Sequence, residues 1–323
     1  MRLAVLGGGA WGTTVAHLCA HNASTTLWAR DAGDVSAINA SHENRRYLAG
    51  HRLHPELKAS NDLAKTVADA DALVIGIPSG AFAELLEKLA PIIPQGIPVI
   101  SLTKGLEPRT GQRMTELIAH YLPEHPFGLL TGPNLAVEIL SRGTTAAVLA
   151  LSDFAIAESL RDSFSTDWFR VQPHRDVIGC ELGAALKNVI AIAVGIVDGI
   201  GGGDNMRAAI MTRGLEEATR LGVALGGRAE TFMGMSGLGD LAATCTSDKS
   251  RNRQVGTALG SGVSIDTVMA EMDQVVEGVA TAPMMARIGR TAGVSMPIVD
   301  QIHALVHRDR NASEVFEGLR SVV

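Results

Sequence analysis

Arg2-Leu3-Ala4-Val5-Leu6-Gly7-Gly8-Gly9-Ala10-Trp11-Gly12, close to the N-terminus, joins an apolar strand pattern to a glycine-rich loop, and a helical pattern follows over residues 13–21. The loop contains G-x-G-x-x-G at Gly7, Gly9 and Gly12. In such a loop one glycine makes the tight turn, one lets the backbone approach a pyrophosphate and one permits close helix–strand packing, while the helix N-terminus donates to phosphates. The order strand, loop, helix predicts a dinucleotide-binding unit, and a purely structural glycine turn is the alternative.

Further short apolar runs of strand type alternate with helical patterns up to about residue 180. The strand-like runs cover residues 3–6, 25–29, 72–77, 99–102, 127–130 and 146–150. Helical periodicity is found at 82–89 and 114–121, the loop Pro78-Ser79-Gly80 precedes the first of these, and Asp153 is placed to cap a later helix. Alternating strands and helices predict an α/β domain of Rossmann type with a parallel-rich sheet.

The second half of the chain has a different pattern, because the strand-like runs stop after Asp176. Long segments rich in Ala, Met and Val cover 183–197, 206–221 and 275–291, with glycine-rich breaks at 199–203 and 234–239. These segments predict an all-α C-terminal domain. We therefore expect a dinucleotide-binding Rossmann domain at 1–180 and a helical domain at 181–323, for which the polar residues described below predict a substrate-binding and catalytic role.

The composition is that of a folded protein, with 46% hydrophobic and 19% charged residues among 323. Lys plus Arg number 28 against 34 Asp plus Glu, and this formal charge of −6 lacks the basic excess that is typical of a general nucleic-acid binder. An anionic substrate must then be met by a local group of basic side chains.

Location and redox state are predicted from the cysteines and the apolar runs. Cys19, Cys180 and Cys245 lie far apart, which predicts neither a disulfide framework nor a zinc site. The chain enters a strand at residue 2 and leaves no room for a signal peptide, and its longest apolar stretch, 189–197, is about half of the ~20 residues that span a bilayer. We expect a reduced, cytoplasmic protein without membrane insertion.

The end of the second predicted strand bears on the choice of cofactor. An acidic residue there usually binds the ribose 2′-hydroxyl of NAD, whereas this chain has Arg30 at or near that position. A guanidinium can pair bidentately with a 2′-phosphate and stack on adenine, which favours NADP. The alternatives are a solvated Arg30, or an Asp31 that takes the hydroxyl and accepts NAD.

Ligands of open α/β sheets bind beyond the carboxyl ends of the strands. Three loops therefore stand out: Ile77-Pro78-Ser79, Thr103-Lys104-Gly105-Leu106-Glu107 and Thr131-Gly132-Pro133-Asn134. Lys104 is a cation suited to an anionic substrate, and a surface lysine beside Glu107 is the alternative.

In the helical half, Lys187 stands with Asn188 in an otherwise apolar helix. Burial of a lysine lowers its pKa toward neutrality, as general acid–base catalysis requires, whereas a lysine with its head in water is the alternative. Asp240 is predicted to orient this lysine and hold its charge.

Ser250, Arg251 and Asn252 lie at a predicted helix start, where they offer phosphate-binding donors. The alternative for Arg251 is an ordinary solvated residue at a helix start.

Other catalytic patterns are not found. His17 and His21 are spaced i, i+4, but the sequence between them lacks the Glu of H-E-x-x-H and is typical of a core helix, so no metal is expected. No G-x-S-x-G elbow or Walker A motif occurs, which argues against a hydrolase or a P-loop enzyme.

These motifs together resemble those of bacterial NAD(P)-dependent glycerol-3-phosphate dehydrogenases, over essentially the whole chain. The matching segments are G-x-G-x-W-G at 7–12, Thr103-Lys104-Gly105, Gly132-Pro133, Lys187-Asn188, 237–244, Ser250-Arg251-Asn252 and Val275-Val276-Glu277-Gly278. The resemblance implies an N-terminal Rossmann domain, a helical C-terminal domain, and interconversion of dihydroxyacetone phosphate and sn-glycerol 3-phosphate for phospholipid synthesis.

The resemblance also implies roles for individual residues. The catalytic residues that the resemblance implies are Lys187, as proton donor and acceptor, and Asp240. Substrate binding is implied for Lys104, Gly132, Asn134, Asp240, Thr244, Ser250, Arg251 and Asn252. Cofactor binding is implied for Gly7, Gly9, Ala10, Trp11, Gly12, Arg30, Lys104, Ala136, Arg251, Val275 and Glu277. Ala10 and Asn134 stand where many members have serine, so one lacks a hydroxyl toward the pyrophosphate and the other presents an amide on the substrate side.

The implied mechanism is hydride transfer from nicotinamide C4 to the C2 carbonyl of dihydroxyacetone phosphate, with a proton from Lys187 and without a metal. NADP is the expected cofactor, NAD a possible one, and a homodimer the expected assembly. Two competing functions are a lysine-dependent dehydrogenase of β-hydroxy acids and a non-enzymatic dinucleotide sensor. Trp11 and the 250–252 cluster weigh against the first, and Lys187 with Asp240 weighs against the second.

Overall fold

The computed structural model describes residues 1–272, 276–308 and 310–322, which form two compact units. The first, the sheet unit, comprises Met1–Thr103 and Met114–Val177, and the second, the helical unit, comprises Lys104–Arg113 and Ile178–Val323. The predicted division at residue 180 assigns to the first part residues 178–180 and, more importantly, the ten residues 104–113, all of which belong to the helical unit. These ten residues join the helical unit because Leu106 is fully buried in its core and Arg113 forms an ion pair of 3.1 Å with Glu181.

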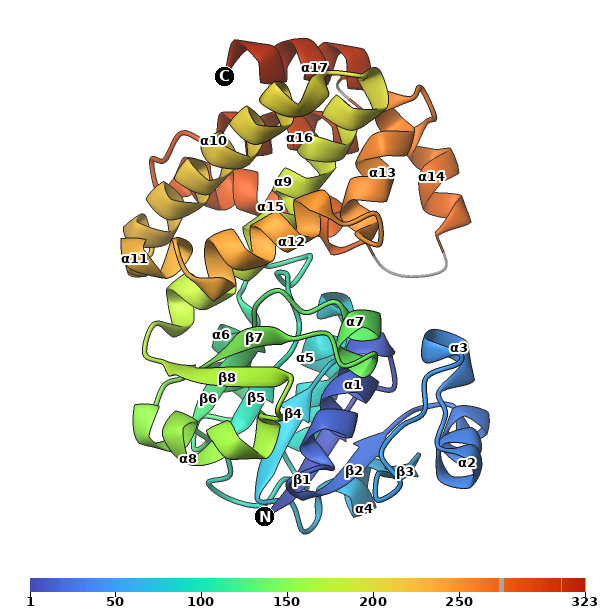
Figure 1. Cartoon of the computed structure of the whole chain (residues 1–323). Coiled ribbons are helices and arrows are strands. Elements are labelled where there is room, and N and C mark those ends of the chain that lie inside the picture. Colours follow the sequence, from blue (N-terminus) through green and yellow to red (C-terminus); the bar gives the residue numbers. More distant parts are fainter. Residues whose placement is uncertain (273–275, 309, 323) are drawn as a thin grey trace. The chain divides into compact units, whose positions relative to one another are not determined.

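The sheet unit, all of whose residues the structure describes, is built on an eight-stranded sheet with the order β3-β2-β1-β4-β5-β6-β7-β8 (Figure 1). The strands are β1 (Arg2–Leu6), β2 (Ser24–Trp28), β3 (Lys58–Ser60), β4 (Ala72–Ile75), β5 (Val99–Ser101), β6 (Phe127–Thr131), β7 (Thr145–Leu151) and β8 (Phe169–His174). Neighbouring strands are parallel except β6 and β7, which are antiparallel. The predicted parallel-rich sheet is confirmed, whereas β3 and β8 were not predicted.

Helices pack on both faces of this sheet. They are α1 (Ala10–Cys19), α2 (Ala32–Ser41), α3 (Arg45–Leu48), α4 (Leu63–Val67), the short η1 (Ser79–Ala81), α5 (Phe82–Leu89), α6 (Met114–Tyr121), α7 (Ala136–Leu140) and α8 (Phe154–Phe164). Because side chains alternate along a strand, Leu3 and Val5 of β1 join the core that includes α1, while Ala4 and Leu6 join the core beneath α5 and α6. Asp153 caps α8, as expected.

The helical unit surrounds one long apolar helix, α9 (Val177–Ile200). Around it lie α10 (Gly203–Ala224), α11 (Ala229–Phe232), η2 (Met235–Gly239), α12 (Asp240–Thr246), α13 (Arg251–Gly260), α14 (Ile265–Glu271), α15 (Glu277–Thr291), α16 (Pro297–Val306) and α17 (Ala312–Ser321) (Figure 1). The expected break at 234–239 is a π-helical turn, η2, that leads directly into α12. Gly237 permits this turn, since a Cβ there would lie 2.1 Å from the Phe232 carbonyl oxygen.

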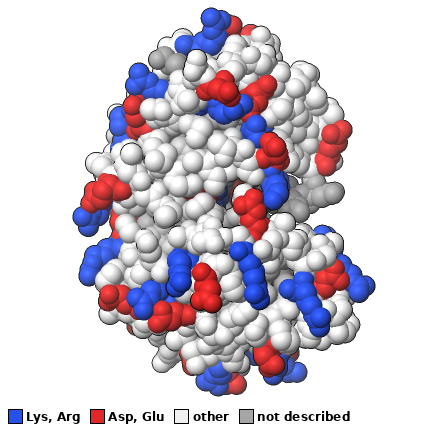
Figure 2. Space-filling model, in the orientation of Figure 1, with Lys and Arg blue, Asp and Glu red and all other residues white. Residues whose placement is uncertain are grey.

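Helix α9 is longer than the apolar stretch 189–197 suggested. It has 24 residues and a mean hydropathy of 1.8 in its most apolar window, enough in length and composition to cross a membrane. However, 89% of that window is buried inside the protein, which is typical of a core helix. Charged side chains of both signs are interspersed on the visible face of each unit (Figure 2).

Candidate active site

The glycine loop between β1 and α1 has a backbone that only glycine can supply. Gly7 has a positive φ of +132°, and a Cβ there would lie 2.2 Å from the Gly76 carbonyl oxygen. A Cβ on Gly12 would lie 2.0 Å from the Gly7 carbonyl oxygen, so this glycine lets α1 approach the loop. The loop is therefore a tight turn from the carboxyl end of β1, an inner strand of the sheet, into the N-terminus of α1.

The N-terminus of α1 is suited to an anionic ligand. Gly9 is its N-cap and contributes no side-chain cap, and a Cβ on Gly9 would meet nothing within 4 Å. Ala10 is the first helical residue. The indole Nε1 of Trp11 is buried and has no hydrogen-bond partner among the residues that the structure describes. An open helix N-terminus fits the pyrophosphate of a dinucleotide, and the unpartnered indole nitrogen is a further donor on the same helix.

Asn44 supports this loop and was not predicted from the sequence. It is fully buried, and its Nδ2 donates to the carbonyl oxygen of Gly8 at 2.8 Å and to Thr13 Oγ1 at 2.9 Å. Its Oδ1 accepts from the backbone N–H of Tyr47, which caps α3. Asn44 comes from a helix-capping position more than thirty residues away, so no local pattern connects it to the glycine loop.

Arg30 lies two residues beyond β2 and is exposed, where its guanidinium is accessible to a ligand. Asp31 instead caps α2, because its Oδ1 accepts from the backbone N–H of Asp34 at 2.9 Å. This engagement makes Asp31 a weaker candidate for the ribose hydroxyl than Arg30 is for a 2′-phosphate.

The loop after β6 carries three of the expected binding residues. Gly132 has a φ of +142°, and Ala136 is the first residue of α7. Between them, both side-chain polar atoms of Asn134, Nδ2 and Oδ1, are buried without a hydrogen-bond partner in the described parts of the chain. Because buried polar groups are almost always satisfied, this amide is suited to bind a ligand or water.

In the helical unit, Asp240 lies between two lysines. Its Oδ1 accepts from Lys187 Nζ at 2.6 Å, and its Oδ2 accepts from Lys104 Nζ at 2.7 Å. The side chains of Lys187, Lys104 and Asp240 are only 9%, 16% and 2% exposed. Two cations and one anion leave a net positive charge in a largely buried position, and such a charge attracts an anionic substrate.

Lys104 is thus not the surface lysine beside Glu107 that was the alternative. Glu107 Oε2 accepts instead from the backbone N–H groups of Arg109 and Thr110 and from the Thr110 hydroxyl, and so closes its own turn. Burial lowers the pKa of Lys104 from 10.5 to about 8, and the opposite charge of Asp240 limits the decrease.

Thr244, on α12, fixes the head of Lys187. Its Oγ1 accepts from Lys187 Nζ at 2.7 Å and donates to the carbonyl oxygen of Asp240 at 2.6 Å. An ammonium group has three N–H donors, so the contacts with Asp240 and Thr244 leave one for a substrate oxygen. Substrate binding by Thr244 stays a prediction; in the structure its hydroxyl orients the lysine.

The predicted helix start at residues 250–252 is present. The Ser250 hydroxyl caps α13 by accepting from the backbone N–H of Arg253, and Arg251 is exposed in the first turn. The Asn252 amide is largely used within the protein: its Nδ2 donates to Asn188 Oδ1 at 2.9 Å and its Oδ1 accepts from Gly278 N at 3.0 Å. One N–H of this amide is left for a ligand.

Asn188 links this helix start to Lys104. While its Oδ1 accepts from Asn252, its Nδ2 donates to the Lys104 carbonyl oxygen at 3.1 Å. Glu277, the first residue of α15, lies close to Gly105, the residue that follows Lys104. A Cβ on Gly105 would lie 2.8 Å from Glu277 Oε2. Val275, the remaining expected cofactor residue, lies outside the described residues.

Among residues 1–272, 276–308 and 310–322, no cluster of three or more His, Cys, Asp or Glu side chains could hold a metal ion. His17 Nδ1 accepts from the backbone N–H of His54 at 2.9 Å, and burial, with nearby His21, His54 and Arg142, lowers its pKa to about 4. His17 is therefore a neutral residue of the core.

Comparison with known proteins identifies similar sequences along both halves of the chain. Residues 2–157 match the N-terminal part, and residues 176–317 the C-terminal part, of NAD-dependent glycerol-3-phosphate dehydrogenase. A glycerol-3-phosphate dehydrogenase [NAD(P)+] of Sphingopyxis alaskensis is 52% identical, with 99% of this chain and 96% of that protein covered. The corresponding protein of Mycobacterium bovis is 44% identical, with 98% and 94% covered.

The solved structures give the same result. The crystal structure of glycerol-3-phosphate dehydrogenase from Coxiella burnetii is similar with a TM-score of 0.94 and 34% identity, covering 99% of this chain and 98% of that chain. A ketopantoate reductase from Ralstonia eutropha has a TM-score of 0.58 at 16% identity, which shows a shared fold alone.

Proposed function

Since this chain belongs to the NAD-dependent glycerol-3-phosphate dehydrogenase family, we propose that Lys187 is its proton donor and acceptor and that Asp240 holds this lysine in place. The protein is an NAD(P)-dependent oxidoreductase that interconverts dihydroxyacetone phosphate and sn-glycerol 3-phosphate. The usual role of this reaction is to supply glycerol 3-phosphate for phospholipid synthesis.

The observation that carries the proposal is the buried cluster of Lys187, Asp240 and Lys104. Bound NAD(P)H supplies the hydride for C2 of the ketone. The remaining N–H of Lys187 donates to the C2 oxygen, stabilises its developing negative charge and transfers the proton. In the oxidation direction the neutral lysine accepts the proton from the C2 hydroxyl. Proton transfer by such a group contributes typically ~10² to 10⁴ in rate.

Lys104 binds the substrate in this proposal. It shares the carboxylate of Asp240 with Lys187, so the cluster keeps one excess positive charge next to the reacting oxygen. That charge attracts a phosphorylated three-carbon substrate and repels other cations. Substrate binding is also proposed for Gly132 and Asn134, after β6.

Cofactor binding is proposed for the glycine loop and its surroundings. Gly7 makes the tight turn, Gly9 lets the pyrophosphate approach the backbone, Gly12 lets α1 pack closely on the loop, and the N-terminus of α1 donates to the phosphates. The buried indole of Trp11 supplies a further donor. Ala10 contributes no hydroxyl, so the backbone carries the pyrophosphate contacts at that position.

The substrate phosphate is proposed to bind at the start of α13, and Arg251→Ala tests this site. The substitution should raise the KM for dihydroxyacetone phosphate roughly tenfold, as expected for loss of a hydrogen bond to a charged group. Reduction of unphosphorylated dihydroxyacetone should change little, because that substrate never made the contact. Steady-state kinetics with both ketones measure the difference. Equal losses would assign Arg251 to the cofactor or to structure.

NADP is the proposed preferred cofactor, with the 2′-phosphate on Arg30. Arg30→Asp should raise the KM for NADPH roughly ten- to a hundredfold and leave that for NADH nearly unchanged, since a charge-assisted bidentate contact is worth about 1.5 to 3 kcal/mol. Parallel titrations of wild type and variant with both cofactors measure the effect. Equal changes for both would refute the role of Arg30.

One assay tests the proposed function as a whole. Absorbance loss of NADPH and NADH is followed with dihydroxyacetone phosphate and, as controls, with a panel of β-keto acids. A β-hydroxy acid dehydrogenase would use the acids, and a dinucleotide sensor would bind NADPH without oxidising it. We also propose a cytoplasmic protein without membrane insertion and a homodimer as its assembly. The burial of most of α9 supports the absence of membrane insertion, and light scattering tests the homodimer.

A further inference from the structure

Helices α9 and α13 contact each other through their backbones. A Cβ on Gly195 of α9 would lie 2.2 Å from the Arg253 carbonyl oxygen, and a Cβ on Gly256 of α13 would lie 2.1 Å from the Ile192 carbonyl oxygen. The hydrogen bond between Asn252 and Asn188 joins the same two helices. Because glycine faces glycine here, α13 cannot change its distance from α9 without repacking the contact.

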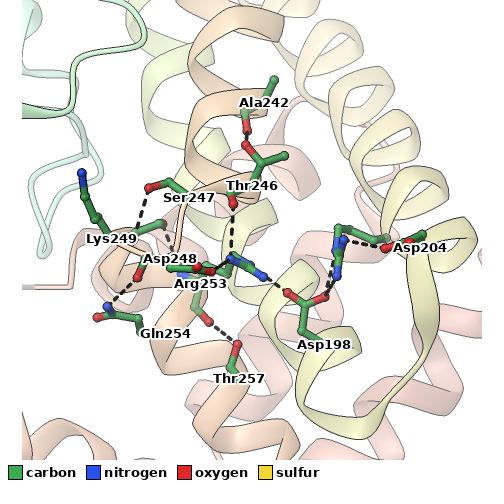
Figure 3. Close-up of polar contacts among 12 residues, drawn as sticks. Asp198, Asp204, Ala242, Thr246, Ser247, Asp248, Lys249, Arg253, Gln254 and Thr257 are labelled. Atoms are coloured by element: carbon green, nitrogen blue, oxygen red, sulfur yellow. Dashed lines mark hydrogen bonds and ion pairs between the residues drawn. The ribbon is translucent and has the colours of Figure 1, made fainter. Parts of the chain in front are cut away.

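Arg253 bridges α9 and the turn that precedes α13 (Figure 3). Its Nε donates to Asp198 Oδ2 at 2.7 Å, while its Nη1 donates to Asp248 Oδ1 at 2.6 Å and to the Thr246 carbonyl oxygen at 3.4 Å. The side chains of Arg253 and Asp198 are 17% and 9% exposed, whereas that of Asp248 is 96% exposed. The ion pair with the buried Asp198 is thus the stronger one. The contacts with Asp248 and with the Thr246 carbonyl oxygen attach the turn to Arg253.

The turn from Thr246 to Ser250 depends on side chains of α13. Gln254 Nε2 donates to the Asp248 carbonyl oxygen at 2.7 Å, and Ser250 Oγ accepts from the Arg253 N–H at 3.3 Å. The turn ends at Ser250 and so leads directly into Arg251 and Asn252. Its position therefore determines where these phosphate-binding candidates present their donors.

Asp198 and Lys187 lie on the same face of α9. They are eleven residues apart, close to three full turns, or about 16 Å along the axis. One helix therefore carries both the proposed proton donor and the anchor of the proposed phosphate site. The spacing between these two points is fixed by α9 itself, provided that Arg253 holds the turn to Asp198.

We propose that Arg253 is a positioning residue that fixes the phosphate-binding start of α13 relative to Lys187. The proposal rests on the proposed function, since it assumes a phosphorylated substrate bound at residues 250–252. The guanidinium is a planar fork that contacts Asp198 and the turn at a set geometry, and a lysine of equal charge lacks that fork. Arg253 itself does not contact the substrate.

The test is Arg253→Lys, with Asp198→Asn as the partner variant. Both should raise the KM for dihydroxyacetone phosphate and the Ki of inorganic phosphate, a competitive probe, by roughly tenfold, since a misplacement of about 1 Å can cost up to ~100-fold. The kcat at saturating substrate and the kcat/KM for unphosphorylated dihydroxyacetone should stay within about threefold of wild type.

Arg207→Gln is the matched control, because Arg207 Nε also donates to Asp198, at 2.8 Å, but its other partner is Asp204 of α10 rather than the turn. This variant should lower Tm as much as Arg253→Lys does and leave the Ki of phosphate unchanged. Should Arg253→Lys fold poorly, Asp248→Asn removes only the negative charge from the exposed arm of the bridge and keeps an acceptor oxygen. It should raise that Ki about two- to threefold.

Three results would overturn the proposal: an unchanged Ki of phosphate in both Arg253→Lys and Asp248→Asn, equal losses with the phosphorylated and unphosphorylated ketones, or an equal rise in Ki for Arg207→Gln. Failure of the proposed function is distinguishable from these, because wild-type enzyme would then not oxidise NAD(P)H with dihydroxyacetone phosphate at all.

Discussion

Lys187→Met should abolish turnover while folding and NADPH binding stay nearly intact. Methionine roughly keeps the length and apolar stem of lysine, so packing around this 9%-exposed side chain should change little. Asp240 would still have Lys104 as its ion-pair partner, so no buried carboxylate loses all of its counter-charge. What disappears is the proton and the positive charge at the substrate oxygen.

The loss should fall on kcat. General acid catalysis is typically worth ~10² to 10⁴ in rate, and the missing electrostatic stabilisation adds to it. Steady-state kinetics, NADPH binding by quenching of tryptophan fluorescence and thermal denaturation measure the three properties. Lys65→Met, at a lysine side chain that is 84% exposed, is the control for the same substitution outside the site. A Lys187→Met enzyme that kept more than about a tenth of wild-type kcat would refute this mechanism.

Asp240→Asn should have the second largest effect, on stability as well as activity. The amide keeps the size of the carboxylate, but Lys187 and Lys104 lose the anion that they share. Breaking a buried ion pair by removing one partner typically costs about 3 to 5 kcal/mol, which denaturant unfolding would detect. The kcat should fall less than in Lys187→Met, because the proton donor is retained.

The pH dependence of the same variant provides an independent check. The pKa of Lys104 is about 8 in the folded protein, against 10.5 normally, because of burial. Between these values the unfolded chain binds the proton and the folded chain does not, so the free energy of unfolding rises with pH across this window. Asp240 opposes the shift, so in Asp240→Asn the window should begin at a lower pH.

Activity should decrease at alkaline pH, where Lys104 loses its charge. In Asp240→Asn this decrease should occur at a lower pH than in wild type, as the change in stability does. Rate and Tm profiles from neutral to alkaline pH measure both. Profiles that coincide for wild type and Asp240→Asn would contradict the shared role of this carboxylate.

The sheet was predicted where the strands are apolar and was missed where they are not. The buried β1 and β4 have clear hydrophobic patterns, whereas β3 is three residues long and β8 contains Pro173 and alternates with polar residues. The antiparallel pairing of β6 and β7 was not predicted, because strand direction depends on the path of the chain rather than on local composition.

In the candidate site, too, some features were predicted from the sequence and others were missed. The Lys187–Asp240 ion pair was expected, and the start of α13 at Arg251 agrees with its predicted place. The contact between Lys104 and Asp240 was not predicted, since it joins residues 136 positions apart. Asn44 was missed for a similar reason: a buried amide that supports another loop has no signature in its own neighbourhood.

Because Lys104–Arg113 belongs to the helical unit, the two units cannot be separated by a single cut in the chain. A chain cut after Val177 would leave this ten-residue segment attached to the wrong fragment, with Leu106 deprived of its apolar surroundings. The fragment that starts at Ile178 would lack Lys104 and the arginine that pairs with Glu181. Hybrids between relatives should therefore exchange residues 104–113 together with the C-terminal part. A single crossover near residue 177 would combine residues 104–113 of one parent with the helical core of the other.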